Sequence, residues 1–180
     1  FPTRRSSDLQ CNAHLPCEVV MQALHLTAYT LTSALGAGIA PHLDALRSKR
    51  SGIVRKLWET LEQPMCIGEV AGVDDLPVRA DLQRYDCRNN RLAQLGLEQD
   101  GFAEAARAAI ARYGANRIGV FMGTSTSGIL SSEVAYRHRD PATGRLPADH
   151  HYRETHNAYS VADFVRSYLH VEGPATVVST

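Results

Sequence analysis

The chain has 180 residues, of which 44% are hydrophobic and 21% charged, and its 19 basic and 19 acidic side chains leave no formal net charge. This length and composition suit a soluble globular domain, and the lack of a basic surplus argues against a nucleic-acid partner, although a local patch for an acidic protein can exist within a neutral total. No apolar run reaches the roughly 18 residues of a membrane span, and no secretory signal is recognised, so a cytoplasmic location is expected.

Residues 1–20 are interpreted as a non-native leader. The run from Phe1 to Leu9 reads like the translation of a sequencing-library adapter, and the following residues have no clear periodicity. We expect this leader to be disordered, and we expect one truncated domain to occupy residues 21–180.

The first half of this domain is expected to open with a strand. Ala23 to Thr30 is mostly apolar and β-branched, which favours a strand. Pro41 suits the first turn of a helix that ends near residue 50. Residues 53–84 are broken by prolines and glycines, so loops are expected there, with one short strand over Ile67 to Val70.

The second half has stronger patterns. Asp86 is a good N-cap for one long helix, whose apolar positions recur at steps of three and four as far as Tyr113. Arg117 to Met122 is continuously apolar, as a strand covered on both faces requires. It leads into the polar, Gly-bounded loop 123–128, and open α/β sheets bind ligands at loops of this kind.

Two further helices are expected, over Leu130 to Tyr136 and over Asn157 to Leu169. The polar residues between them read as a surface excursion. The alternation of strands and helices predicts an α/β fold.

Three blocks of the sequence, in their order and spacing, resemble the β-ketoacyl-[acyl-carrier-protein] synthases. The blocks are Thr27, Ser33 and Gly36 with Ser51-Gly52-Ile53; Arg117-Ile118-Gly119 with Gly123 and Gly128; and Gly173-Pro174 with Ala175 to Thr180. They look like the family's opening strand and first helix, its Arg-Ile-Gly strand and Gly-rich loop, and the strand before its nucleophile.

The chain also departs from the family pattern. The family usually has Gly where Ala28 and Thr30 stand and often has Pro where Ala34 stands, which suggests a divergent branch. The stretch Arg88-Asn89-Asn90-Arg91 is similar to ketosynthases of bacterial aryl-polyene and xanthomonadin-like pigment pathways.

The resemblance implies a thiolase-like α/β fold, of which this chain holds an incomplete first half with a mixed sheet between helices. It implies an acyltransferase that performs decarboxylative Claisen condensation of an acyl thioester with malonyl-carrier protein, in fatty acid, polyketide or aryl-polyene biosynthesis. The nucleophilic Cys is expected just beyond Thr180, so no catalytic residue is assigned within the chain and the fragment itself is expected to be inactive. No cofactor is implied.

The resemblance implies an acyl-pocket role for one set of residues and a subunit-pairing role for another. Thr126 falls where the family lines its acyl pocket, and Ser125 flanks it. A second set falls where two subunits pair strand to strand: Ala175, Thr176, Val177, Val178 and Ser179. The implied partners are acyl carrier protein, loaded with acyl or malonyl groups, and a second subunit in a homodimer or a heterodimer of ketosynthase and chain-length factor.

The residues alone leave other interpretations open. Thr126 can be an ordinary loop hydroxyl, and Ala175 to Thr180 can be only a core strand. The chain can also be a non-catalytic partner subunit similar to chain-length factors, or a doubly wound small-molecule-binding domain unrelated to thiolases.

Other reactive side chains have simpler explanations. His150, His151 and His156, with Asp149 and Glu154, have suitable chemistry for zinc, but histidines in a polar loop are more often solvated, and no metal site is expected. The cysteines (Cys11, Cys17, Cys66 and Cys87) show no paired spacing, which favours reduced thiols. The loop 123–128 lacks the last glycine of a Gly-x-Ser-x-Gly nucleophile elbow.

Overall fold

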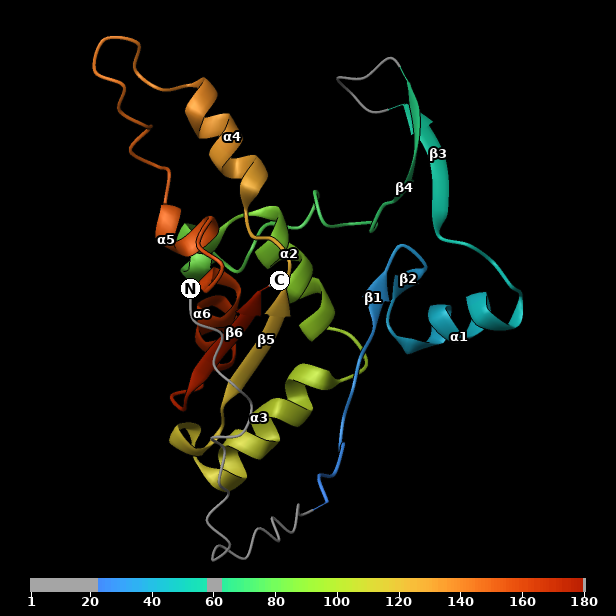
Figure 1. The fold of residues 1–180 in the computed structure, drawn as a ribbon. Helices are drawn as coiled ribbons and strands as arrows, with labels where there is room; N and C mark the ends of the chain where they lie inside the picture. The colour runs from blue at the N-terminus through green and yellow to red at the C-terminus, as the bar shows by residue number, and fades with distance from the viewer. Residues whose placement is uncertain (1–22, 58–62, 180) are drawn as a thin grey trace, which may run out of the picture.

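The structure, a computed structural model, describes residues 23–57 and 63–179 (Figure 1). The expectations about the leader and about Thr180 lie outside the described residues. The elements are, in order, β1 (Thr32–Ser33), β2 (Gly36–Ala37), α1 (Ile39–Arg47), β3 (Ile53–Leu57), β4 (Pro64–Gly68), η1 (Ala80–Tyr85), α2 (Arg88–Leu97), α3 (Phe102–Tyr113), η2 (Ala115–Arg117), β5 (Val120–Thr124), α4 (Ile129–Arg137), α5 (Tyr152–Thr155), α6 (Ser160–Leu169) and β6 (Ala175–Ser179).

Helix α6 lies at the centre of the core. The four residues that the sequence predicts on its inner face are all buried, which confirms this helix: Val161, Phe164, Val165 and Tyr168. Phe164 is completely buried and meets the ring of Tyr85 edge-on, with ring centroids 6.0 Å apart. The helix packs on β5 and β6 and contacts η1 and α2, so it joins the layers of the core (Figure 1).

Strands β5 and β6 pair in parallel, from Val120 opposite Ala175 to Thr124 opposite Ser179. Among the described residues, the other two ladders are the antiparallel hairpins β1–β2 and β3–β4. The expectation that the strand near residue 120 is covered on both faces is wrong: Val120 is buried, but Phe121 on the opposite face is 73% exposed. A continuous apolar run therefore marks a strand with one open face here.

The strand predicted over Ala23 to Thr30 is not formed. Leu24 and Leu26 are 97% and 82% exposed, and pairing begins only at Thr32, in a hairpin of two residue pairs. Apolar, β-branched composition is insufficient for a strand when no neighbour supplies a ladder.

Helix α1 forms as predicted, and its N-terminus is capped from a distant part of the chain. The backbone N–H of Ile39 donates to both carboxylate oxygens of Asp100, at 3.1 and 3.0 Å, and Thr30 Oγ1 donates to the same group at 2.8 Å. Asp100 thus fixes the first helix against the segment that joins α2 to α3.

The single long helix predicted from Asp86 to Tyr113 is wrong, because the structure divides it into α2 and α3. The break lies at Asp100 and Gly101, whose φ angles are 55° and 71°. Asp and Gly are among the residues that adopt this left-handed conformation most readily. The N-cap of α2 is Cys87, one residue after the predicted Asp86.

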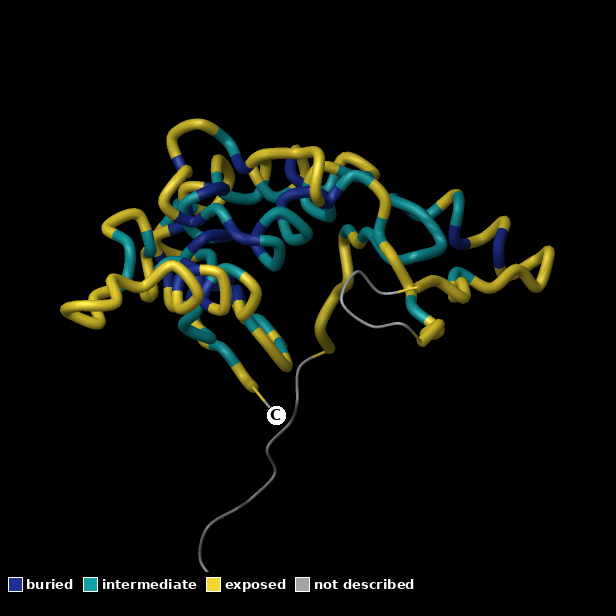
Figure 2. Tube along the Cα trace, turned by 90° about the horizontal axis from the view of Figure 1, so that it is seen from above, coloured by how far each residue is buried: buried dark blue, intermediate teal, exposed yellow. Residues whose placement is uncertain are grey.

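Two parts of the molecule project from the core (Figures 1 and 2). One is the arm formed by β3 and β4. The sequence did not predict β3, and it placed β4 three residues too late. The other is the predicted helix α4 with the long excursion after it. No helix in the described part of the chain is long and apolar enough to span a bilayer.

The buried phenol of Tyr168 gives a test of the core. Its hydroxyl donates to Glu98 Oε1 at 2.7 Å, and burial together with this carboxylate raises the pKa of Tyr168 to about 12. In the unfolded chain this pKa is about 10. The folded state holds the proton more tightly, so the contribution to stability is complete below about pH 10 and is lost as the pH rises toward about 12.

We therefore expect the free energy of unfolding to fall more steeply above about pH 10 in the wild type than in Tyr168→Phe. Denaturant unfolding at a series of alkaline pH values measures this difference. Parallel pH profiles for the two proteins would contradict the assignment.

Candidate functional site

The candidate site lies at the carboxyl ends of the parallel strands. Strand β5 ends at Thr124 and β6 at Ser179, and these two residues are partners in the ladder. The loop 125–128 leads from β5 directly into α4. The polar loop that the sequence predicts at this edge is present, but it is shorter than the predicted 123–128, because Gly123 and Thr124 belong to β5.

Two cavities flank this loop. The first, of about 500 Å³, lies between the loop, the base of the β3–β4 arm and α2. The second, of about 390 Å³, lies between the loop, the α5 region and the end of β6. Thr126 lines both cavities, whereas Ser125 lines only the second. A bulkier side chain at position 126 would therefore reduce the space on both sides of the loop.

The wall of the first cavity is mainly apolar. Its apolar side chains come from β4, the segment after it, α2 and α4: Ile67, Val70, Val73, Leu92, Ile129 and Leu130. Its polar lining residues are Glu69 after β4, Arg88 and Asn89 at the start of α2, and the hydroxyl-bearing Thr126, Ser127 and Ser131. Such a wall suits an extended aliphatic group better than a highly charged one.

The second cavity contains residues that the sequence did not single out for this role. Tyr152 stacks on His156 with ring centroids 5.1 Å apart, and both line the cavity with Asn157 and Ser179. Ser127 Oγ donates to the backbone carbonyl of His156, not to its ring. This contact gives Ser127 no general base, in agreement with the absence of a nucleophile elbow.

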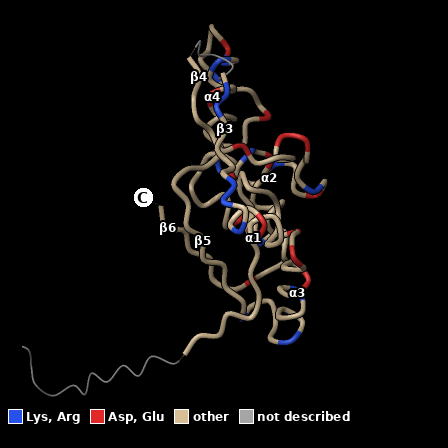
Figure 3. Tube along the Cα trace, turned by 90° about the vertical axis from the view of Figure 1, so that its right-hand side faces the viewer, with Lys and Arg blue, Asp and Glu red and all other residues tan. Residues whose placement is uncertain are grey.

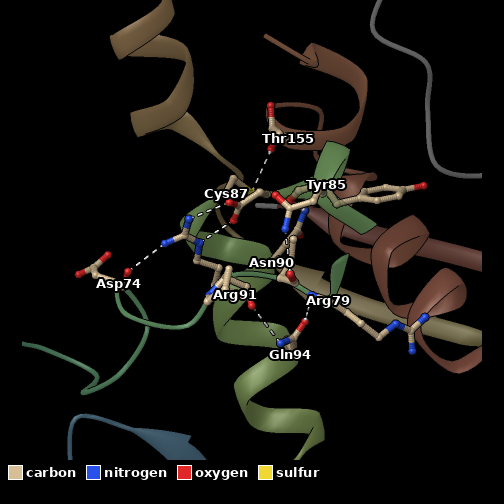
Figure 4. Close-up of polar contacts among 12 residues, drawn as sticks. Asp74, Arg79, Tyr85, Cys87, Asn90, Arg91, Gln94 and Thr155 are labelled. Carbon is tan, nitrogen blue, oxygen red and sulfur yellow. Dashed lines mark hydrogen bonds and ion pairs between the residues drawn. The ribbon is translucent and has the colours of Figure 1, made fainter. Parts of the chain in front are cut away.

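A backbone hydrogen bond to the carbonyl oxygen of Thr155 holds the end of the loop in place. This atom accepts the backbone N–H of Gly128 at 2.8 Å and the hydroxyl of Ser160 at 3.3 Å. It also accepts the thiol of Cys87 at 3.8 Å (Figure 4). Burial raises the pKa of the Cys87 thiol, so this group stays protonated and can donate. Cys87 is therefore a packing residue and not an activated nucleophile, although it stands at a helix N-terminus.

The Arg88-Asn89-Asn90-Arg91 stretch forms the first turn of α2 and anchors it. Asn90 is fully buried, and its amide donates to the carbonyls of Tyr85 at 2.9 Å and Glu154 at 3.2 Å (Figure 4). Arg91 makes a two-pronged ion pair with Asp86, at 2.5 and 2.7 Å, and also reaches the Asp74 carbonyl. Asp86 thus binds an arginine instead of capping the helix.

Strand β6 has one edge on β5, and no strand within residues 23–57 or 63–179 pairs with its other edge. Val178 is 66% exposed, and Thr176 and Ser179 are exposed as well. This geometry leaves the outer edge of β6 accessible to a second subunit, while Ala175 and Val177 pack against the core. The role of Ala175 to Ser179 in a dimer stays a prediction.

The histidines considered for zinc do not form a ligand set. His156 lies at the second cavity, while His150 and His151 line a different cavity next to α4. Among the described residues, no three His, Cys, Asp or Glu side chains come together in a way that would hold a metal ion. Cys66 is exposed on β4 and is not bonded to Cys87.

The described residues have a thiolase-like α/β fold, in which β5 and β6 pair in parallel and a Gly-rich loop leads from β5 into α4. A solved structure of the ketosynthase ApeO in complex with its chain length factor ApeC, from Xenorhabdus doucetiae, contains a chain that matches with a TM-score of 0.66 and 29% sequence identity. The match covers 85% of this chain and 38% of that one. Neither protein-family models nor curated proteins give a match.

The chain is therefore related to the thiolase-like ketosynthases, as its three sequence blocks predict. It spans 38% of the length of the ketosynthase-complex chain that it matches.

Gly128 provides a test of how the loop is held. A Cβ atom at this position would lie 2.7 Å from the Thr155 carbonyl oxygen and 2.9 Å from Cys87 Cβ. We expect Gly128→Ala to destabilise the fold by about 1–3 kcal/mol, because the loop must move away from α5 and α2.

Gly123→Ala is the matched control, since a Cβ there has no neighbour within 4 Å. Urea unfolding measures both variants. Equal stability of the two alanine variants would contradict the tight contact at Gly128.

Proposed function

We propose that the chain is part of a β-ketoacyl-[acyl-carrier-protein] synthase that performs decarboxylative Claisen condensation. One observation carries the proposal: Ser179, at the end of β6, lines the same cavity as Ser125 and Thr126. A nucleophile that follows β6 would therefore emerge beside the loop to which the resemblance gives the acyl pocket. The relationship to ketosynthases supports this assignment.

The proposed reaction has two stages. The thiolate of a Cys after Thr180 attacks the carbonyl carbon of an acyl thioester, and the carrier-protein thiol leaves. Malonyl-carrier protein then loses CO₂, and the resulting enolate attacks the acyl-enzyme carbonyl and frees the Cys. Within the described residues, Thr126 and Ser125 would line the space for the acyl chain.

A second candidate is a non-catalytic subunit similar to a chain-length factor. The matched complex contains both kinds of subunit, and the cavity around Thr126 would serve either one. In this case the chain would shape the acyl tunnel of a ketosynthase without a nucleophile of its own.

The partners follow from the same proposal. The exposed edge of β6 would pair with a second subunit, either identical or of the complementary kind, and acyl carrier protein would deliver both substrates. We place this activity in the cytoplasm. The anchoring role of Arg88 to Arg91 is compatible with the aryl-polyene branch that this stretch resembles, and we propose that branch for the chain.

The first test is the residue encoded after Thr180. We expect Cys at position 181, and we expect a polypeptide extended through the whole reading frame to form an acyl-enzyme with acyl-carrier protein, detected by intact-protein mass spectrometry. Gln, Ala or Gly at that position would favour the non-catalytic subunit. A Cys that never becomes acylated would contradict the condensing enzyme.

The second test concerns the acyl pocket. In the extended protein, Thr126→Phe should shorten the longest acyl group that is accepted, because the larger ring fills space in both cavities. Thr143→Phe, on the exposed excursion after α4, is the matched control. Competition between acyl-carrier proteins of different chain lengths measures the shift, and an unchanged preference in Thr126→Phe would exclude position 126 from the pocket.

A further inference from the structure

A polar cavity beside α5 and α6 plays no part in the candidate site. We name it the α5–α6 cavity. Its volume is about 390 Å³, and besides one aromatic and one apolar residue it is lined by Arg153, Asp163, Arg166, Ser167, His170 and Glu172. His170 and Glu172 lie before the amino end of β6, whereas Ser179 of the candidate site lies at the carboxyl end of this strand. A ligand in the α5–α6 cavity would therefore not compete with one beside Thr126.

Helix α6 contributes its polar face to this cavity. Asp163, Arg166 and His170 follow one another at steps of three and four residues, so they lie on one side of the helix. Phe164 and Tyr168, on the other side, are buried in the core. The helix ends at His170, whose φ of 59° is left-handed and turns the chain toward β6. One face of α6 therefore serves the core, and the other lines the cavity.

The two arginines of the cavity have unused hydrogen-bond donors. Among the described residues, Nε of Arg166 is buried without a partner, and no carboxylate lies within 4.0 Å of Arg153 or Arg166. By contrast, nearby Arg79 makes a two-pronged ion pair with Asp81, at 2.6 and 2.9 Å. Figure 3 shows the basic and acidic residues along the chain. A buried guanidinium donor without a partner is costly, and oxyanions are the ligands that satisfy it best.

Asp163 and Glu172 restrict which oxyanion this cavity can accept. An ionised carboxylate only accepts hydrogen bonds, so a ligand beside it must offer a donor. Inorganic phosphate near neutral pH keeps at least one O–H group, while its other oxygens accept hydrogen bonds from arginine. Sulfate at the same pH has no proton to donate, and the two carboxylates repel its charge. The mixture of arginines and carboxylates therefore favours phosphate over sulfate.

We propose that the α5–α6 cavity is a binding site for inorganic phosphate. Oxygen atoms of the ion accept hydrogen bonds from Arg153, Arg166 and the hydroxyl of Ser167. The O–H group of the ion donates to Asp163 or Glu172. This inference goes beyond the proposed function and does not depend on it, because no residue of the candidate site takes part.

A bound phosphate connects α5 with α6. Arg153 belongs to α5, and Arg166 belongs to α6. The carbonyl of Thr155, at the end of α5, accepts the N–H of Gly128 in the loop that carries Thr126. An ion that binds the folded chain and not the unfolded one stabilises the fold by mass action, so phosphate strengthens the packing that holds this loop.

The test is isothermal titration calorimetry of the 180-residue chain with sodium phosphate and with sodium sulfate, at neutral pH and equal ionic strength. We expect phosphate to bind at least about tenfold more tightly than sulfate. Arg166→Gln should weaken phosphate binding at least about tenfold, because a hydrogen bond to a charged group is lost. Arg153→Gln, at an exposed position, carries the same expectation and replaces Arg166→Gln if circular dichroism shows that variant to be unfolded.

Two controls match these changes in charge. Arg47→Gln, exposed on α1, should alter the phosphate affinity less than about twofold. Asp163→Asn/Glu172→Gln should admit sulfate and reduce the preference for phosphate to less than about threefold, because the repelling carboxylates are gone. Asp44→Asn/Glu133→Gln makes the same change at exposed positions and should keep the preference.

Each other outcome overturns the inference. Absence of phosphate binding by the wild type would remove the site, and equal weakening in Arg166→Gln and Arg47→Gln would show an effect of net charge alone. Equal affinity for phosphate and sulfate would show unspecific attraction of anions. Tighter binding of glycerol 3-phosphate than of phosphate would assign the cavity to a phosphate ester. None of these results changes the proposed function, which the acylation of residue 181 tests separately.

Discussion

The carbonyl oxygen of Thr155 is the point at which the parts of the site are joined. It receives hydrogen bonds from the loop after β5, from the first residue of α6 and from the N-cap of α2, through Gly128, Ser160 and Cys87. Thr155 and Ser160 are buried, so these bonds form away from water, where an unpaired partner would be costly. Three elements that are far apart in the sequence therefore share one acceptor.

This shared acceptor explains why a short polar loop can hold a defined shape between two cavities. Gly128 lies against Cys87 and Thr155 without room for a Cβ atom, and Thr126 stands two residues before it. The buried amide of Asn90 supports the same junction from the other side, since it binds the carbonyl of Glu154 next to Thr155. The space that Thr126 borders is therefore set by α2 and α5 as much as by the loop itself.

The elements that could be predicted from the sequence are those with a local cause. Helices α1, α4 and α6 have apolar spacing or boundary residues that act within a few positions, and the loop after β5 is marked by its own glycines. The elements that were missed depend on distant partners. The break between α2 and α3 is stabilised by the bond from Ile39 to Asp100, across 61 positions of sequence. No local pattern contains that contact.

The candidate site likewise contains some residues that the sequence predicts and others that only the three-dimensional packing brings in. Ser125 and Thr126 could be found because they follow a recognisable strand, and the resemblance to ketosynthases gave them a role. Tyr152 and His156 join the second cavity only through the packing of α5 beside the loop, and nothing in the residues around them signals this position. The N-cap moved from Asp86 to Cys87 because Arg91 binds the carboxylate of Asp86.

The parallel pairing of β5 with β6 has a consequence for how the protein folds. The two strands are separated in the chain by α4, the long excursion, α5 and α6, so their ladder closes a large loop of unstructured chain when it forms. Contacts of such long range are slow to form and bring no gain until the intervening segment is ordered. Helix α6, which leads into β6 and covers the strand pair, is the natural element to condense first.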